Sequence, residues 1–466
     1  MPTTRGQGKD LVGAIRLQAA YKTARTNLVS AQGFAPTELG LRGIINEEAE
    51  PDHTGRMVRR GSTPHASDAE WDAVVPLKPA GTSSVAPDWI DFMQVGMFFS
   101  GVAYSGGTTV SAGADVLSAY LTGVSGLSVG KAIRIETGSG TSNYDFRIIT
   151  DLSGTTGVGK VVWWPALSAA PVSGARIGST KTFRLDNTAS DTAFTLQSWL
   201  TNTSKRVWGA VPESYSFQLG NNTHPMVTMN GFGRGYTQAG PTSLASAMAG
   251  ATGTTIALVN PDLVGPGFVH VIGSEHLLLS SKNEDGTYTM ATAARGLNGT
   301  VATSHVAGTA VTVYKPTMTL AGVPIPAQYC CVDVGVTSAT VQRLEGTETT
   351  VTIDGGLVKD EQLFCDDYIT PSYGKGDEMA PQIQVTSKLD DDKMAYFTRA
   401  GDGDNVGVVI RMGRRAGRMV GIIAPTALFR APDATEGGVQ GSVPMTLTWE
   451  ARGLRTGLDA IYFVTG

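Results

Sequence analysis

The alternating segment 214–229 constrains the fold of this chain more than any other feature. Tyr215 and Phe217 alternate with polar residues, and Val227 and Met229 resume the alternation after an Asn-Asn pair. Period-two alternation across a short polar turn predicts a β-hairpin with one buried face. Because no nucleophile, metal-binding cluster or phosphate-binding loop accompanies the hairpin, we interpret it as part of a structural framework.

Composition favours β-sheet through the rest of the chain. The 466 residues include 58 glycines, 17% of residues are charged and 41% are hydrophobic. This profile fits strands joined by many turns better than helical bundles or a disordered chain. At about 150 residues per domain, the length predicts roughly three domains, each large enough to bury its own core.

The charge of the chain argues against a nucleic-acid-binding surface. The net charge at pH 7 is −5, whereas proteins that grip DNA or RNA gather Lys and Arg against the phosphates. One basic cluster stands out, made of Arg411, Arg414, Arg415 and Arg418. We interpret it as a solvated turn or a face for salt bridges between subunits, with a nucleic-acid patch as the alternative.

Cysteine content and hydropathy bear on the compartment. Cys330 and Cys331 are adjacent and Cys365 stands alone, so we expect no disulfide framework and folding in a reducing compartment. The polar N-terminus shows no secretory signal, and no apolar run approaches the ~20 residues of a membrane span. We therefore expect a soluble protein with no membrane partner.

Three segments have helical patterns. Residues 11–28 carry a thin apolar face, which predicts either a frayed terminal helix or an arm that docks on a neighbouring subunit. Residues 87–99 and 389–398 both combine an acidic first turn with apolar residues at three- and four-residue spacing. The similar order of helix and strands around these two segments predicts an internal duplication with diverged halves.

Two other segments have the pattern of separate β modules. Between residues 107 and 179, and again between 243 and 313, short alternating strands follow one another through Gly- and Ser-rich turns. Each segment predicts a small β-barrel or sandwich that is inserted into, or attached to, a larger sheet. We expect at least one of the two on the outside of an assembly.

Motifs for nucleotide and metal binding are incomplete. The sequence of segment 126–131 (GLSVGK) partly matches the pattern of a phosphate-binding loop. However, Ser125 stands where that pattern needs Gly, and Ala132 stands where it needs Ser or Thr. The acidic groups 390–392 and 402–405 offer oxygens for Ca²⁺, yet neither follows EF-hand spacing. We interpret the first acidic group as a helix start, where carboxylates favour the helix dipole, and the second as a turn.

The histidines form no local catalytic or metal-binding group. They are His53, His65, His224, His270, His276 and His305. On one regular strand His270 and His276 would point to the same face about 20 Å apart, too far for two ligands of one zinc ion. No Ser-His-Asp or Cys-His grouping is visible in the local sequence. We therefore predict that the protein is not an enzyme and has no catalytic residues, no cofactor and no metal site.

Several motifs taken together resemble one protein family. APDWIDFMQVGMF, GLSVGKAIRIETGSGTSNYDFRIIT with KVVWWPAL, KTFRLDNTASDTAFTLQSW, and WGAVPESYSFQLGNN with MVTMNGFGRG resemble the major tail tube proteins of bacteriophages with long, non-contractile (siphovirus-type) tails. The segment HLLLSSKNEDGTYTMATAARGLNGTVATSHVAGTAVTVY is similar to a small β module of phage tail proteins. The resemblance covers roughly residues 35–466 and is less distinct in the second half.

The resemblance implies a mainly β fold with two tandem tail-tube domains, each a β-sandwich or sheet with a flanking helix, plus small inserted β modules. An N-terminal arm would occupy residues 1–35, and a first tube domain 36–240 would contain the inserted module 107–179. A small module on the outer surface would occupy 241–316, and a second tube-like domain 317–466.

The resemblance also implies a structural protein of the virion, made in the host cytoplasm and self-assembled into stacked rings. The resulting tail tube would hold the tape-measure protein, meet the tail terminator and distal tail proteins at its ends, and conduct viral DNA without specific binding during genome ejection. Two tube domains per chain would give a ring of three chains with pseudo-sixfold symmetry, with six single-unit chains as the alternative.

A second class of protein competes with this interpretation. A β-sandwich adhesin or carbohydrate-binding surface protein would also have Thr- and Gly-rich strands, and the inserted modules would then carry its ligand sites. The missing signal segment and the lack of repeated exposed aromatic residues argue against it. A β-rich hydrolase, a third class, would need a carboxylate pair or triad, and the sequence offers none.

Overall fold

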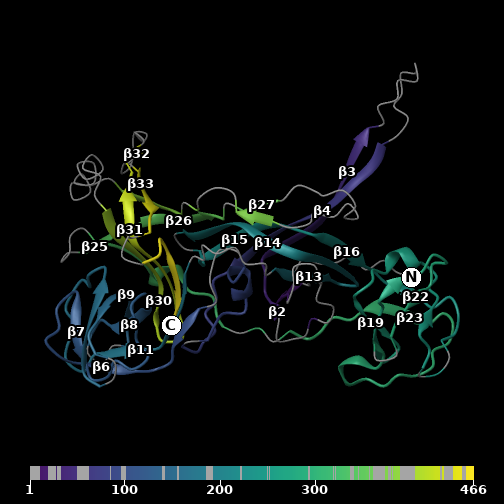
Figure 1. Cartoon of the computed structure of the whole chain (residues 1–466), viewed down its shortest axis with the longest axis horizontal. Coiled ribbons are helices and arrows are strands. Elements are labelled where there is room, and N and C mark those ends of the chain that lie inside the picture. The colour runs from purple at the N-terminus through teal and green to yellow at the C-terminus, as the bar shows by residue number, and fades with distance from the viewer. Residues whose placement is uncertain are drawn as a thin grey trace, which may run out of the picture.

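The computed structural model describes most of the chain. The described residues are 11–18, 28, 33–49, 62–83, 85–95, 101–138, 142–154, 157–184, 193–220, 223–248, 250, 252–291, 294–318, 320, 322–335, 341–344, 346–355, 357–359, 373–375, 379, 381–388, 405–430, 433–434, 444–453 and 458–466. Within them the fold is mainly β, in several sheets, and no helix reaches seven residues (Figure 1).

The largest sheet joins strands from both halves of the chain. Its strands before residue 240 are β1 (Val12–Leu17), β2 (Gly33–Phe34), β3 (Glu38–Ala49), β4 (Ser62–Pro76), β5 (Val102–Tyr104), β12 (Thr180–Arg184), β13 (Phe194–Leu200), β14 (Thr203–Gly220), β15 (Met226–Gly233) and β16 (Gly235–Ala239). Its later strands are β24 (Cys330–Gly335), β25 (Val341–Leu344), β26 (Gly346–Asp354), β29 (Gln382–Lys388), β30 (Asn405–Arg415), β31 (Arg418–Phe429), β32 (Asp433–Ala434), β33 (Pro444–Ala451) and β34 (Tyr462–Thr465). A separate ribbon pairs β27 (Leu357–Lys359) with β28 (Tyr373–Lys375).

The predicted hairpin lies in the middle of this sheet and is confirmed. In it β14 and β15 pair antiparallel, with Tyr215 opposite Met229 and Phe217 opposite Val227. On its other edge β14 pairs with β26, where Phe217 lies opposite Val351. The two halves of the chain therefore share one continuous antiparallel sheet.

Alternation along these strands builds one large core. A row of buried side chains, Phe217, Val351, Ile383 and Trp449, crosses from β14 through β26 and β29 to β33. All four belong to a single hydrophobic cluster that also contains residues of β1, β4, β13 and β34. Because alternate residues of β26, β29 and β33 enter this cluster, a one-residue slip of any of these three strands would turn its apolar face to water.

Two of the predicted helices take other forms. Residues 12–17, expected within a helix, form β1, which pairs over its whole length with β13, so a helical assignment there is wrong. In the segment 87–99 only Ile90–Met93 is helical among the described residues, as the four-residue 3₁₀ helix η3. Trp89, Ile90, Phe92 and Met93 are all buried, whereas Asp91 and Gln94 are half-buried, so the apolar side of this single turn packs into the core. The third segment, 389–398, lies outside the described residues.

A closed barrel occupies the interval 107–179. Its strands are β6 (Thr108–Ala112), β7 (Ser118–Leu121), β8 (Ala132–Glu136), β9 (Tyr144–Leu152), β10 (Gly159–Trp164) and β11 (Arg176–Gly178). Alternate residues fill the barrel with their own core, which includes Ile133, Ile149 and Trp163.

The barrel packs firmly on the main sheet. A hydrophobic cluster joins Tyr144 and Phe146 of β9 to Val409 of β30, Met419 of β31 and further residues of β34. At Gly421 a Cβ atom would lie 2.5 Å from the ring of Phe146, so only glycine allows this approach. The outer wall of the barrel is thus part of the body of the protein.

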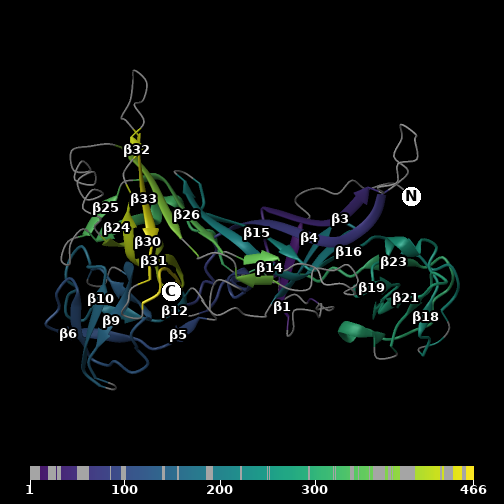
Figure 2. The ribbon, with the colours of Figure 1, turned by 45° about the horizontal axis from the view of Figure 1, so that its top comes forward.

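A second module lies at the opposite end of the molecule from the barrel (Figures 1 and 2). It has its own hydrophobic cluster, and its sheets consist of β17 (Thr242–Ser243), β18 (Thr255–Ile256), β19 (Val269–Ile272), β20 (Glu275–Leu278), β21 (Ser281–Lys282), β22 (Tyr288–Thr289) and β23 (Ala310–Val313). Other short helices within the described residues are η4 (Pro261–Leu263), η6 (Leu297–Gly299) and η7 (Ala327–Tyr329). Buried Arg206 of β14 anchors the module, since its guanidinium lies 4.1 Å from the Phe268 ring centroid and donates to the Gly267 carbonyl at 2.7 Å.

Candidate functional site

The main sheet presents a polar face on the side opposite the large core. One row of residues directly across neighbouring strands reads Thr228, Ser216, Thr352, Gln382 and Glu450, from β15 through β14, β26 and β29 to β33. Each of these side chains is at least partly exposed, whereas the residues before and after it on the same strand are buried. We call this surface the polar sheet face.

A second row extends the polar sheet face by one pleat. Gln218 of β14 lies opposite Thr350 of β26, which lies opposite Gln384 of β29 and, next along, Thr448 of β33. Hydroxyl and amide side chains of this kind are solvated without carrying charge. The face therefore runs without interruption across strands from both halves of the chain.

Carboxylates outnumber basic residues on this face. The acidic residues at outward positions, or at the bulge of β14, are Glu38, Glu70, Asp72, Glu213, Glu348, Asp354 and Glu450. Among the described side chains of these strands, Arg42 of β3 is basic and lies at an outward position of this face, and Lys205 is exposed near the start of β14. Arg42 forms an ion pair with Asp72, while Glu450 accepts from Arg430 and Arg452. The uncompensated charge of the face is negative.

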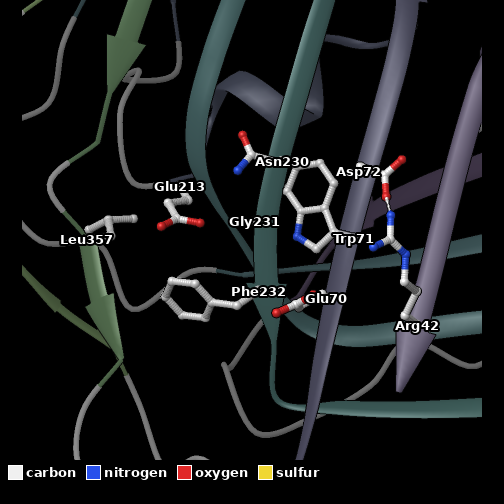
Figure 3. Close-up of a pocket in the computed structure, with 9 residues that line it drawn as sticks. All are labelled: Arg42, Glu70, Trp71, Asp72, Glu213, Asn230, Gly231, Phe232 and Leu357. Carbon is white, nitrogen blue, oxygen red and sulfur yellow. Dashed lines mark hydrogen bonds and ion pairs between the residues drawn. The ribbon is translucent and has the colours of Figure 1, made fainter. Parts of the chain in front are cut away.

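A pocket of about 630 Å³ opens at one end of the face, between β4, β15 and β14 (Figure 3). Its floor is Trp71, whose indole N–H donates to the Val211 carbonyl at 3.2 Å. Glu213 reaches its wall because β14 bulges between Pro212 and Ser214. The described residues contain no group of three or more His, Cys, Asp or Glu side chains able to hold a metal ion, and we interpret the pocket as a solvated depression.

The segment 126–131 forms a turn that leads into β8. Gly126 and Gly130 have φ angles of +79° and +80°, and the Lys131 ammonium donates to the Gly126 carbonyl at 2.8 Å. A phosphate-binding loop would instead be followed by a helix whose first N–H groups face the anion. The acidic groups 390–392 and 402–404 lie outside the described residues, and Asn405 begins β30.

The histidines are spread through the described structure. His270 and His276 do not share one strand as assumed from the sequence, because Gly273, with φ of +60°, turns the chain between β19 and β20. His270 is buried and burial lowers its pKa to about 4, whereas His276 packs 4.2 Å from the ring centroid of Tyr314. His305 contacts Glu275 and His224 contacts the Ile325 carbonyl. His53 lies outside the described residues, as does the side chain of His65.

The arginine cluster divides into one structural and three surface residues. Arg411 pairs with Asp145 at 2.6 Å and contacts the Cys331 sulfur. Arg414, Arg415 and Arg418 lie around the turn between β30 and β31.

Among the described cysteines, Cys330 and Cys331 are free thiols, and burial raises the pKa of Cys330 to about 12. Cys365 lies outside the described residues.

No protein-family model matches the chain, and no curated protein matches it. Of the helices in the described part, none has the length and apolar character needed to cross a membrane.

The polar sheet face was not identified as a site from the sequence, although the alternation in TETTVTID, QIQVTSK and PMTLTWE carries its signal. Recognising it required the strand order, which brings β26, β29 and β33 beside the hairpin.

Proposed function

We propose that this protein is a structural virion protein that assembles into stacked rings and forms the tail tube of a long-tailed bacteriophage. The polar sheet face is the observation that supports this role best, and in the proposed tube it lines the bore. Basic side chains bind phosphates tightly, because the contact releases counterions from the DNA. A wall of solvated hydroxyl and amide groups with a negative net charge makes no such contacts, so a polyanion can pass along it freely.

The edges of the sheet also support ring formation. Within the described strands, β3 pairs only with β4 and β25 pairs only with β24, so each has one free edge. Free strand edges favour pairing with another chain. A head-to-tail contact between two different edges produces a ring when its rotation closes.

The two halves of the chain are, in this proposal, diverged tube units that each supply part of the wall. The continuous sheet through β14 and β26 supports this division of the wall. Three chains would then complete a ring with pseudo-sixfold symmetry. The tape-measure protein, the end proteins of the tail and the viral DNA are the partners that the role requires.

Electron microscopy of the purified chain tests the proposal. We expect rings or hollow tubes with three chains per ring in negative stain. Separate particles or strings of beads at high protein concentration would favour the adhesin alternative. Tubes built from six chains per ring, each with one wall-forming unit, would keep the tube and overturn the two-unit wall.

Cysteine labelling tests which face lines the bore. We expect Thr352→Cys to react with a bulky polymer-maleimide in the monomer and to be protected at least about tenfold after tube assembly. Val158→Cys, on the barrel and 66% exposed, is the matched control and should stay reactive in both states. Both changes are made with Cys365→Ser, while Cys330 reacts slowly because burial raises its pKa to about 12. Equal protection of the two sites contradicts the bore assignment.

A further inference from the structure

The surface arginines of the β30–β31 turn border a small pocket. The pocket measures about 270 Å³ and is lined by Arg414, Arg415 and Arg418, by Tyr329, and by the proline-rich segment 323–326. The Arg414 guanidinium lies 4.4 Å from the centroid of the Tyr329 ring, which restricts its orientation. We call this surface the arginine pocket.

The arginine pocket concentrates positive charge that the described residues do not neutralise. Arg415 and Arg418 are exposed and lie directly opposite each other across the turn, a placement in which like charges destabilise a pair of strands. No carboxylate of the described part of the chain forms an ion pair with either residue or with Arg414. A partner that supplies carboxylates would relieve this repulsion.

The proline-rich wall of the arginine pocket favours a protein partner. Val323 in this wall is 66% exposed, and apolar side chains beside Arg and Tyr are typical of the centre of protein–protein contacts. A nucleic acid would offer phosphates to the arginines but no apolar side chain to Val323. The pocket therefore suits a protein segment in which carboxylates lie beside apolar side chains.

The second module carries such a segment around η4. Asp262 of η4 has a side chain that is 86% exposed. Leu263, also in η4, and Val259 just before it are exposed apolar residues. The segment thus presents a carboxylate between two apolar side chains.

Two further carboxylates lie next to η4. The exposed residues Glu284 and Asp285 occupy the turn between β21 and β22, and a Cβ atom at Gly286 of this turn would lie 3.6 Å from the Pro261 ring. Lys282 is the basic residue that the described structure places here, and it pairs with Asp262. Three carboxylates and one ammonium group leave this surface with net negative charge. We call it the acidic corner, made of Val259, Asp262, Leu263, Glu284 and Asp285.

The arginine pocket and the acidic corner of one chain lie far apart. In both views the second module lies at the opposite end of the molecule from β30 and β31 (Figures 1 and 2). A contact between the two surfaces consequently needs two copies of the chain.

We propose that the arginine pocket binds the acidic corner of a second copy of this chain. The carboxylates of the corner neutralise Arg415 and Arg418, and its apolar side chains cover Val323. Because one copy uses its pocket and the other its corner, the contact is head-to-tail and can continue to further copies. This inference rests on the proposed self-assembly and names two surfaces that join neighbouring chains.

Cross-linking between two kinds of single-site chain tests the contact. Full-length chains with Val323→Cys or Leu263→Cys, both also carrying Cys365→Ser, are mixed and treated with a short bis-maleimide. We expect a cross-linked dimer from the mixture and little from either chain alone, since the two positions lie on opposite sides of one contact. Burial raises the pKa of Cys330 and Cys331, so these thiols react slowly.

Charge reversal with rescue tests the electrostatics. R415E/R418E in the Val323→Cys chain, or E284R/D285R in the Leu263→Cys chain, should lower the cross-linking yield by about tenfold or more, because like charges then face each other. Mixing the two reversed chains should restore the yield. The control K131E/R176E reverses two basic residues of the barrel segment and should cross-link as the unchanged charges do.

Electron microscopy of the same samples separates the outcomes. Rings or tubes without the cross-link overturn the contact and leave the tube intact, whereas the cross-link without rings or tubes supports the contact and contradicts the tube. Absence of both overturns both. Loss of the cross-link in R415E/R418E without rescue identifies a different occupant and overturns the proposal. If R415E/R418E instead abolishes binding of a double-stranded oligonucleotide and leaves cross-linking unchanged, the pocket binds nucleic acid and the proposal is wrong.

Discussion

Replacing Asp333 with alanine is expected to lower the free energy of unfolding by about 3–5 kcal/mol, because the change leaves a buried positive charge without its partner. Asp333 on β24 is 2% exposed, pairs with Arg343 at 2.8 Å, and lies 3.7 Å from the guanidinium of Arg147 on barrel strand β9. Arg147 is fully buried, and its other N–H groups donate to the carbonyls of Phe146 and Ala166. The ion pair therefore ties the barrel to the main sheet.

Chemical denaturation with a compensating variant measures this effect. The double change R147M/D333L replaces the buried pair with apolar side chains, and we expect it to recover most of the lost stability. As a control, Asp72→Ala breaks the solvent-exposed pair with Arg42 and should cost less than ~1 kcal/mol. A loss in Asp333→Ala no larger than in Asp72→Ala would show that the buried pair does not hold the barrel in place.

Local alternation made part of this fold predictable from the sequence. The hairpin of β14 and β15 follows from the spacing of Tyr215, Phe217, Val227 and Met229. Apolar residues at every second position indicate a β-strand with one buried face. The six barrel strands all lie within the interval 107–179, whose turns are rich in Gly and Ser. These features depend on neighbouring residues and need no long-range information.

Other features depend on contacts between distant residues. Val12–Leu17 has a weak helical pattern, yet pairing with β13 decides its conformation. The turn at Gly273 separates His270 from His276. The sequence pattern did not reveal this turn, and both histidines were therefore assigned to one strand. The polar sheet face and the pair of Asp333 with Arg147 required strand order, which single-sequence patterns do not contain. Long-range register is thus the information that the sequence analysis lacked.

Replacing Glu275 with glutamine is expected to destabilise the second module by about 3 kcal/mol or more, since a buried arginine then loses its counter-charge. Glu275 is fully buried and accepts two hydrogen bonds from Arg295, both at 2.7 Å. Its Oε2 atom also accepts from the Thr303 N–H at 3.0 Å and lies 2.8 Å from His305 Nε2. These groups connect β20 with the loop that precedes β23.

The pH dependence of this loss distinguishes the carboxylate from a mere packing effect. Burial favours the neutral acid, but the hydrogen bonds from Arg295, Thr303 and His305 outweigh it and lower the pKa of Glu275 from 4.5 to about 2. A carboxyl group with a depressed pKa in the folded state stabilises the protein above pH 4.5, and that contribution is lost as the pH falls toward 2. The stability gap between the unchanged protein and Glu275→Gln should therefore be constant from pH 8 to about 5 and shrink below pH 4.5.

Hydrogen exchange locates the effect in the second module. Because the module has its own core around Leu277 and Val311, we expect faster exchange in residues 269–313 of Glu275→Gln and little change in the barrel. Asp285→Asn, at an exposed turn of the same module, is the matched control and should exchange as the unchanged protein does. A gap that stays constant down to pH 3 would mean that packing, and not the charge of Glu275, holds these strands together.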